Sequence, residues 1–170
     1  ETFQELVQKG LGGFLVRNME SYGILDAMGL TYRIVLDANI YTMNNRAEAF
    51  WMKKGILGDT VPLELNAKEL VHRNNKNSEL TVYGYTPMMV SVQCVQKTMD
   101  HCNHACVQYV LKDRYQKEFR GVCSCEFCYN TIYNTLPTSL LKEKEKAEKL
   151  GVKAYRLSFT TETQQETEKI

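Results

Sequence analysis

The chain has 170 residues, of which 44% are hydrophobic and 24% are charged, and these values are ordinary for a globular protein. Its net charge of +1 gives no electrostatic argument for binding to nucleic acid or to a membrane surface. No apolar run approaches the length of about 18 residues that a membrane-spanning helix needs, so we predict a protein outside the membrane. The length is sufficient for one domain with a sizeable core, and we predict a single domain over residues 1–170.

The chain opens in the middle of a structural pattern. Residues 1–16 read as a helix that leads directly into a strand, with neither an initiator methionine nor a signal peptide. We therefore expect a fragment cut from a longer protein, and we expect that protein to be cytoplasmic.

Short apolar runs alternate with helical stretches along most of the chain. The expected strands are residues 12–17, 32–38, 61–65, 79–85 and 154–160. The expected helices are residues 19–28, 46–54, 67–72, 140–150 and 161–170. Strands that alternate with helices of about ten residues predict a parallel sheet with helical crossovers.

Residues that cap helices support this assignment. Asn18 precedes the first of these helices, and Asn45 and Asn66 precede the next two. Glu48 and Glu69 each follow three residues after those asparagines, as in a capping box.

The spacing fits either a (β/α) barrel or a doubly wound sheet. A complete eight-stranded barrel needs about 250 residues, so five strands predict a partial TIM-type barrel of the α/β class. No glycine-rich phosphate loop follows any strand, which gives a dinucleotide-binding fold little support. A partial barrel exposes strand edges. We therefore expect either self-association or completion by a missing N-terminal half of the same barrel.

The alternation breaks over residues 86–136, between the fourth and fifth expected strands. Within this stretch, residues 107–114 and 117–122 alternate like two antiparallel strands of a hairpin. An insertion at the carboxyl end of a barrel strand is where active sites are usually built.

This insertion contains every cysteine of the chain. They are Cys94, Cys102, Cys106, Cys123, Cys125 and Cys128. Six clustered cysteines without a secretory signal favour a metal site over a disulfide framework. Four thiolates suit either a structural zinc ion or an iron–sulfur cluster. Buried structural thiols and a catalytic cysteine–histidine pair, with His101 or His104 beside Cys102, remain open as alternatives.

Several sequence stretches resemble one known family. TPMMVSVQC, YVLKDRYQKEF, CEFCYNTIYNTLPTSLL and AYRLSFTTET occur in the order found in the collagenase-like peptidases, unassigned peptidase family 32 (U-32), and especially in its long multidomain bacterial branch. The resemblance covers nearly the whole chain. It implies a (β/α) barrel in which four cysteines hold a 4Fe–4S cluster.

The resemblance also implies an activity. Better-understood members take part in prephenate-dependent, oxygen-independent hydroxylation of RNA or of a quinone precursor, so we expect RNA or a small acid as the substrate. The family name implies a collagenase-like protease as the alternative, and a non-catalytic module held by a zinc or other four-cysteine site is a third. We expect the fragment alone to be inactive.

Carried over residue by residue, the resemblance implies the following site. The cluster ligands would be Cys94, Cys102, Cys125 and Cys128, with Cys123 as a replacement for Cys125 and Cys106 as an extra thiol. Substrate-binding residues would be Arg156, Asn134 and Tyr133, where Arg156 could hold a carboxylate through two hydrogen bonds or form a structural salt bridge.

The chain also departs from the family pattern. The acidic-aromatic-His-Gly stretch of the collagenase-type members is missing before Cys94. Tyr85 stands where an arginine is common, and Ser158 stands where an aspartate is common. The first departure argues against an inherited protease activity, and the other two concern substrate handling.

Overall fold

The computed structural model describes residues 3–100 and 102–170, which form two compact units. Unit 1 contains the residues up to Thr81 and Lys142–Arg156, and unit 2 contains Val82–Leu141 and Leu157–Ile170. The whole predicted insertion, residues 86–136, therefore lies in unit 2. None of the helices in the described part of the chain has both the length and the apolar character needed to cross a bilayer.

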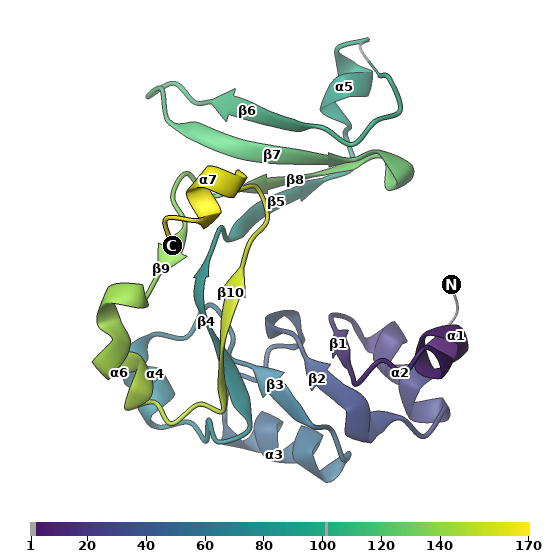
Figure 1. Ribbon diagram of the computed structural model, residues 1–170, viewed down its shortest axis with the longest axis vertical. Coiled ribbons are helices and arrows are strands. Elements are labelled where there is room, and N and C mark those ends of the chain that lie inside the picture. Colours follow the sequence, from purple (N-terminus) through teal and green to yellow (C-terminus); the bar gives the residue numbers. More distant parts are fainter. Residues whose placement is uncertain (1–2, 101) are drawn as a thin grey trace. The chain divides into compact units, whose positions relative to one another are not determined.

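The helices and strands follow one another along the chain as shown in Figure 1. The α-helices are α1 Phe3–Gln8, α2 Met19–Ala27, α3 Asn45–Lys53, α4 Ala67–Val71, α5 Val95–Thr98, α6 Lys144–Glu148 and α7 Gln164–Thr167. The strands are β1 Phe14–Val16, β2 Ile34–Leu36, β3 Gly58–Thr60, β4 Ser78–Gly84, β5 Pro87–Ser91, β6 Gln108–Lys112, β7 Glu118–Ser124, β8 Tyr129–Tyr133, β9 Thr138–Ser139 and β10 Ala154–Ser158. Short 3₁₀ turns are η1 Thr31–Arg33, η2 Ala38–Ile40, η3 Cys125–Phe127 and η4 Leu141–Glu143.

Unit 1 is built on a parallel sheet. The strand order is β1-β2-β3-β4-β10, and β1 to β4 pair in parallel in the order in which they occur in the chain. One row of paired residues crosses four strands through Val16, Leu36, Asp59 and Ser78. The predicted α/β class with a parallel sheet is thus confirmed, and no barrel closes within the described residues.

Helices cover one face of this sheet. Val16, Ile34 and Leu36 of the sheet pack with Tyr22 of α2 and Trp51 of α3, whose rings meet edge to face with centroids 4.8 Å apart. Side chains alternate between the two faces along a strand, so Leu15 and Val35 point to the opposite face. The apolar periodicity of the strands and helices is therefore explained by a single core on the helical side.

The caps show which helix starts were predicted correctly. Asn18 accepts a hydrogen bond from the Ser21 amide, and Asn66 and Glu69 form the predicted capping box. The cap of α3 is Asn44 and not Asn45, because the Asn44 side chain accepts the amides of the first turn.

Three predicted elements were wrong in whole or in part, and of the helix expected over residues 161–170 only α7 forms. Residues 61–65 form no strand, since the third parallel strand is β3, and its partner rows end at Thr60. The helix expected over residues 140–150 is reduced to η4 and α6, and Thr138 and Ser139 pair with β4 in strand β9 instead of capping a helix. The third strand does not extend over residues 61–65 because the Pro62 nitrogen has no hydrogen to donate to a neighbouring strand.

Arg73 and Asp59 form a buried ion pair on the helical side of the sheet in unit 1. Arg73 donates to Asp59, and the exposed fractions of their side chains are only 2% and 1%. Asp59 also accepts from the hydroxyls of Thr42 and Ser78, the latter at 2.5 Å. The Arg73 guanidinium further donates to the Thr42 carbonyl at 2.9 Å and to Asn75 at 2.9 Å. Both charges are thus fully hydrogen-bonded, as burial requires.

Unit 2 is built on an antiparallel sheet with the strand order β5-β8-β7-β6. The β6–β7 pair confirms the predicted hairpin, with Tyr109 opposite Gly121. On this unit Arg120 forms a two-point ion pair with Glu166, which belongs to a capping box with Thr163 at the start of α7. Arg120 also lies over the ring of Tyr85, 4.9 Å from its centroid.

Candidate metal centre

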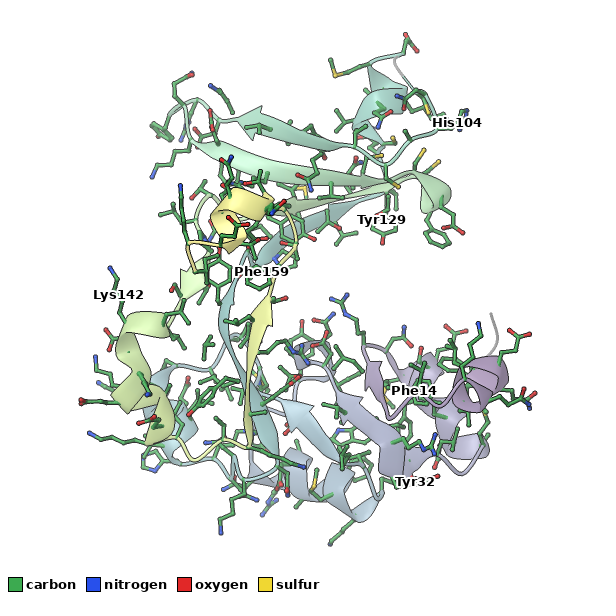
Figure 2. All side chains as sticks on the ribbon, in the orientation of Figure 1. Phe14, Tyr32, His104, Tyr129, Lys142 and Phe159 are labelled. Atoms are coloured by element: carbon green, nitrogen blue, oxygen red, sulfur yellow. The ribbon has the colours of Figure 1, made fainter. Side chains whose placement is uncertain are left out.

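The cysteines of unit 2 come from two chain segments. Cys94 precedes α5, and Cys102 and Cys106 follow α5 in the loop that leads to β6. Cys123 lies in β7, Cys125 begins the 3₁₀ turn η3, and Cys128 directly follows that turn. The β6–β7 pairing brings the two segments together, since the Cys123 amide donates to the carbonyl of Val107 just after the first segment. Figure 2 shows sulfur atoms gathered near the labelled residues His104 and Tyr129.

Cys94 and Cys123 form a buried pair. Their sulfur atoms lie 3.5 Å apart, and both side chains are buried. The amide of Lys97 in α5 lowers the pKa of Cys94 by hydrogen bonding to its sulfur, whereas burial raises the pKa of Cys123 to about 11. The two thiols therefore differ in proton affinity, and Cys94 is the thiol of the pair that loses its proton more readily.

A second group lies on the more exposed side of the loops. The ligand atoms of Cys102, His104 and Cys125 all lie within 4.8 Å of one another. The Cys125 amide donates to the sulfur of Cys106 at 3.4 Å, and the Cys128 thiol lies 3.7 Å from the Cys125 carbonyl. Burial is the main cause that raises the pKa of Cys125, and the charges of the surrounding thiols add to it.

The backbone of this group adopts an uncommon conformation. His104 has a φ of 57° and Cys128 has a φ of 53°, both in the left-handed region that non-glycine residues rarely occupy. Such conformations persist where the surroundings impose them, and they cluster at ligand-binding sites.

The predicted ligands are divided between these two groups. Cys102 and Cys125 lie together, Cys128 lies next to Cys125, and Cys94 is paired with Cys123. His104, which the family resemblance leaves out, lies with Cys102 and Cys125. His101 lies outside the described residues.

The donor set fits a metal centre. Thiolates and an imidazole are the ligands that zinc and iron–sulfur centres use. The charges of several neighbouring thiols help to raise the pKa of Cys125. A bound cation would offset this repulsion between thiolates and would favour the deprotonated form that ligation requires. The described residues could therefore hold a metal, as the sequence predicted in its coarser form.

Unit 1 contains a separate polar row on the face of the sheet without helices. The row that follows Leu15 and Val35 consists of Arg17, Asp37, Thr60 and Glu79, one from each of the four parallel strands or the residue directly after it. Asp37 binds Arg17 at 2.8 Å, and Thr60 donates to Glu79 at 2.8 Å. This row lies at the carboxyl ends of β1, β2 and β3, where parallel α/β folds bind their ligands.

Arg156 of β10 joins this row. Its guanidinium binds Asp37 and donates to Thr60, at 2.8 Å and 2.9 Å, and it also forms an ion pair with Glu79. The predicted substrate-binding arginine is therefore held by two carboxylates of its own chain. Arg17 is the more accessible cation, because 62% of its side chain is exposed against 21% for Arg156.

The other two predicted substrate residues lie in unit 2. Tyr133 ends β8. The Asn134 side chain accepts a hydrogen bond from the Thr135 amide at 2.8 Å, and the Asn134 amide donates to the Thr86 carbonyl. Asn134 thus shapes the turn after β8.

Sequence reasoning missed Asp37, Glu79 and Arg17 as members of a polar row. A signal for two of them was present, since Arg17 and Asp37 each directly follow a short apolar strand. The carboxyl ends of parallel strands meet at one edge of a sheet, so these positions could have been compared across the strands. Glu79 lies near the start of its strand, and only the register with Thr60 reveals it.

Comparisons of the chain with protein-family models, with curated proteins and with solved structures find no match.

Proposed function

We propose that unit 2 holds a metal centre built from its clustered cysteines. The observation that carries the proposal is the convergence of Cys102, His104 and Cys125 from two chain segments, with Cys106 and Cys128 beside them. Following the resemblance to the U-32 family, we propose a 4Fe–4S cluster held by Cys94, Cys102, Cys125 and Cys128.

The chain would then be part of a cytoplasmic enzyme of the prephenate-dependent hydroxylation type. Two features of unit 1 support a partial (β/α) barrel. Consecutive strands are neighbours without the reversal of order that a doubly wound sheet has. Helices cover one face only, and the opposite face carries the polar row, with Leu15 left 48% exposed. A missing N-terminal half of the barrel would cover that face, and self-association would be the substitute in the isolated chain.

The substrate of such an enzyme would be RNA or a small acid. The exposed guanidinium of Arg17 is suited to a carboxylate or a phosphate, and its geometry allows two hydrogen bonds. Arg156 would not bind the substrate itself but would position Asp37 and Glu79 through its two ion pairs.

A single zinc ion is the second candidate, and a specific distance favours it. Zinc–sulfur bonds of about 2.3 Å in a tetrahedron place ligand sulfurs about 3.8 Å apart. The mutual distances within Cys102, His104 and Cys125, all inside 4.8 Å, match one shared ion. A cluster binds each thiolate to a different iron and needs no histidine. A zinc site would make unit 2 a non-catalytic module whose loops unfold on metal removal.

The two candidates differ in their ligands, so matched variants separate them. The protein is purified without oxygen, and iron, sulfide and zinc are measured in the wild type and in Cys94→Ser, His104→Gln and His72→Gln. A 4Fe–4S cluster predicts iron and sulfide that are lost in Cys94→Ser and kept in His104→Gln. A zinc ion at Cys102, His104 and Cys125 predicts zinc that is lost in His104→Gln and kept in Cys94→Ser. His72 is exposed at the end of α4 in unit 1 and serves as the histidine control. If the wild-type protein binds neither iron nor zinc, the proposal of a metal centre is wrong.

The collagenase-like protease remains the third candidate, and it would need Cys102 as a nucleophile and His104 as its base. Their ligand atoms lie within 4.8 Å, whereas a working pair needs hydrogen-bond distance of about 3 Å. Cleavage of denatured collagen that survives a chelator and disappears in His104→Gln would establish it.

A further inference from the structure

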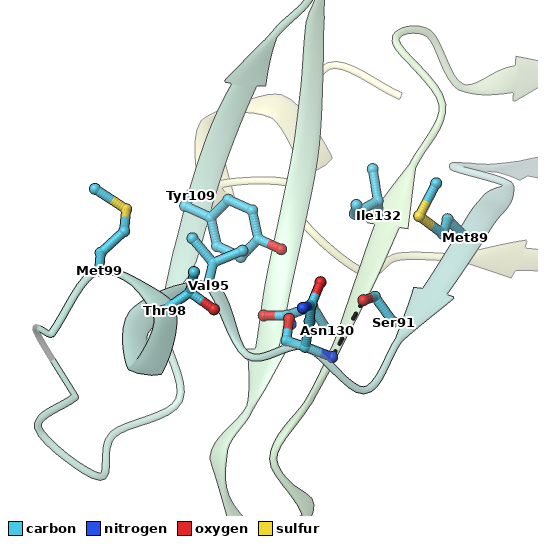
Figure 3. A pocket seen from close by; sticks show the side chains of 9 residues that line it. Met89, Ser91, Val95, Thr98, Met99, Tyr109, Asn130 and Ile132 are labelled. Atoms are coloured by element: carbon cyan, nitrogen blue, oxygen red, sulfur yellow. Dashed lines mark hydrogen bonds between the residues drawn. The ribbon is translucent and has the colours of Figure 1, made fainter.

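Unit 2 contains a hollow of about 230 Å³ between α5 and the antiparallel sheet. Its walls are formed by Met89, Ser91, Gln93, Val95, Thr98, Met99, Tyr109, Asn130 and Ile132, all of them within unit 2. Figure 3 shows Tyr109 and Asn130 directed toward this space, with Met89 and Met99 at its sides. A cavity of about 150 Å³ lined by aliphatic side chains is already large enough to accept benzene.

Two buried oxygen atoms of residues that line this hollow have no hydrogen-bond partner among the described residues. They are Asn130 Oδ1 and the hydroxyl of Tyr109. Asn130 is 1% exposed, and a buried polar atom without a partner costs about 1–3 kcal/mol. Such atoms are rare in folded proteins and call for an explanation, such as a functional role or a bound water or ion.

The orientation of the Asn130 amide is determined by its surroundings. The Asn130 Nδ2 group donates to the carbonyl of Gln93 at 2.5 Å. A flipped amide would place its oxygen against that carbonyl, so Oδ1 must be the atom that lacks a donor. The position of the Tyr109 hydroxyl is likewise determined, because the ring lies across Gly121, where an added Cβ would come within 2.3 Å of it.

The chemistry of the walls restricts the ligand. Among the residues that the structure describes, no charged side chain lines the hollow, so an ion there would lose hydration without gaining a partner. Asn130 Oδ1 only accepts, which requires an O–H or N–H group on the ligand, while the Tyr109 hydroxyl can donate or accept. Met89 and Met99 are exposed and flexible, and such side chains adapt to an apolar ligand.

We infer that this hollow is a binding site for a small neutral molecule, an apolar ring or short chain that carries one hydroxyl. The ligand hydroxyl donates to Asn130 Oδ1 and accepts from the Tyr109 hydroxyl, while its apolar part contacts Val95 and Ile132. The hollow borders the cysteine region, because Gln93 and Val95 flank Cys94, and it differs in kind from a site for an acidic substrate.

The experiment is an NMR titration of the full 170-residue chain, kept reduced, with benzyl alcohol, toluene and benzoate. Benzyl alcohol is expected to saturate the protein. Toluene has no donor and should bind about 2- to 10-fold more weakly, which is the effect of one hydrogen bond, and benzoate should not bind. Absence of saturable binding of benzyl alcohol overturns the inference and assigns the two oxygen atoms to water.

Three variants locate the binding. Tyr109→Phe removes only the hydroxyl and should weaken benzyl alcohol about 2- to 10-fold while leaving toluene unchanged. Val95→Phe fills the hollow and should abolish binding of both. Tyr115→Phe is the matched control, because Tyr115 is 68% exposed in the hairpin turn and lies outside the lining. Binding that persists in Val95→Phe would place the ligand elsewhere and overturn the inference.

Discussion

The sulfur atoms of Cys94 and Cys123 lie 3.5 Å apart in the interior of unit 2. The amide of Lys97 lowers the pKa of Cys94, and burial raises that of Cys123, so Cys94 gives up its proton more readily than its neighbour. A thiolate is the reactive form of cysteine in disulfide formation.

We therefore predict that mild oxidation of the metal-free protein with diamide links Cys94 to Cys123 first. Peptide mapping by mass spectrometry identifies the link. Cys123→Ser should prevent it, and Cys128→Ser should leave it unchanged. A first link between Cys102 and Cys125 would contradict the prediction.

Removal of one partner of the buried pair of Arg73 and Asp59 should strongly destabilise unit 1. Arg73→Leu leaves the Asp59 carboxylate buried without a counter-charge, at a cost of about 3–5 kcal/mol in the free energy of unfolding. The double variant with Asp59→Leu should cost much less than the sum of the two single variants. Urea unfolding measures all three, and additive effects would show that the ion pair is not the cause.

Arg156 and Arg17 both bind Asp37, and their exposures predict different effects. Arg156→Met removes one donor from each of two partly buried carboxylates, which then keep Arg17 and Thr60 as donors, and it should lower the free energy of unfolding by about 1–3 kcal/mol. Arg17→Met removes a mostly exposed partner and should cost at most about 1 kcal/mol. Equal losses in urea unfolding would argue against a positioning role for Arg156.

The ion pair of Glu166 with Arg120 should make unit 2 sensitive to acid. Hydrogen bonds from Arg120 lower the pKa of Glu166 from 4.5 to about 2. A lowered pKa in the folded state stabilises the fold at pH values above 4.5, and this stabilisation is lost as the pH falls through about 2.

The stability difference between the wild type and Glu166→Gln should therefore be constant above pH 5 and shrink toward pH 2. Unfolding midpoints at a series of pH values give this difference. Glu168→Gln, at the exposed end of the same helix, serves as the control. A difference that is independent of pH would refute the assignment.

Gly121 is needed because the Tyr109 ring covers it. A Cβ at this position would come within 2.3 Å of two ring atoms, so Gly121→Ala should displace Tyr109 and cost about 1–3 kcal/mol of unfolding free energy. Gly12→Ala is the control, since no atom of the described part of the chain lies within 4 Å of its added Cβ. Thermal unfolding compares the two, and a neutral Gly121→Ala would show that the ring can move freely.

Local patterns predicted much of the fold because their causes are local. Asn18 and the Asn66–Glu69 pair were assigned correctly as caps, since a cap depends on side chains within three residues of the helix start. The hairpin of β6 and β7 was likewise predictable from alternation. Residues 61–65 misled the prediction because an apolar run does not distinguish a strand from the segment that follows one.

The cysteine site was predictable only as a region. The sequence by itself determined that all six thiols lie in one insertion between two parallel strands, because the composition and the order of the elements are properties of the chain. Only the tertiary structure decided that Cys94 faces Cys123 and that His104 joins Cys102 and Cys125. These neighbours come together through the pairing of β7 with β6 and, by way of β8, with β5. The polar row of Arg17, Asp37, Thr60 and Glu79 has the same origin, because residues far apart in sequence become neighbours through the pairing of strands.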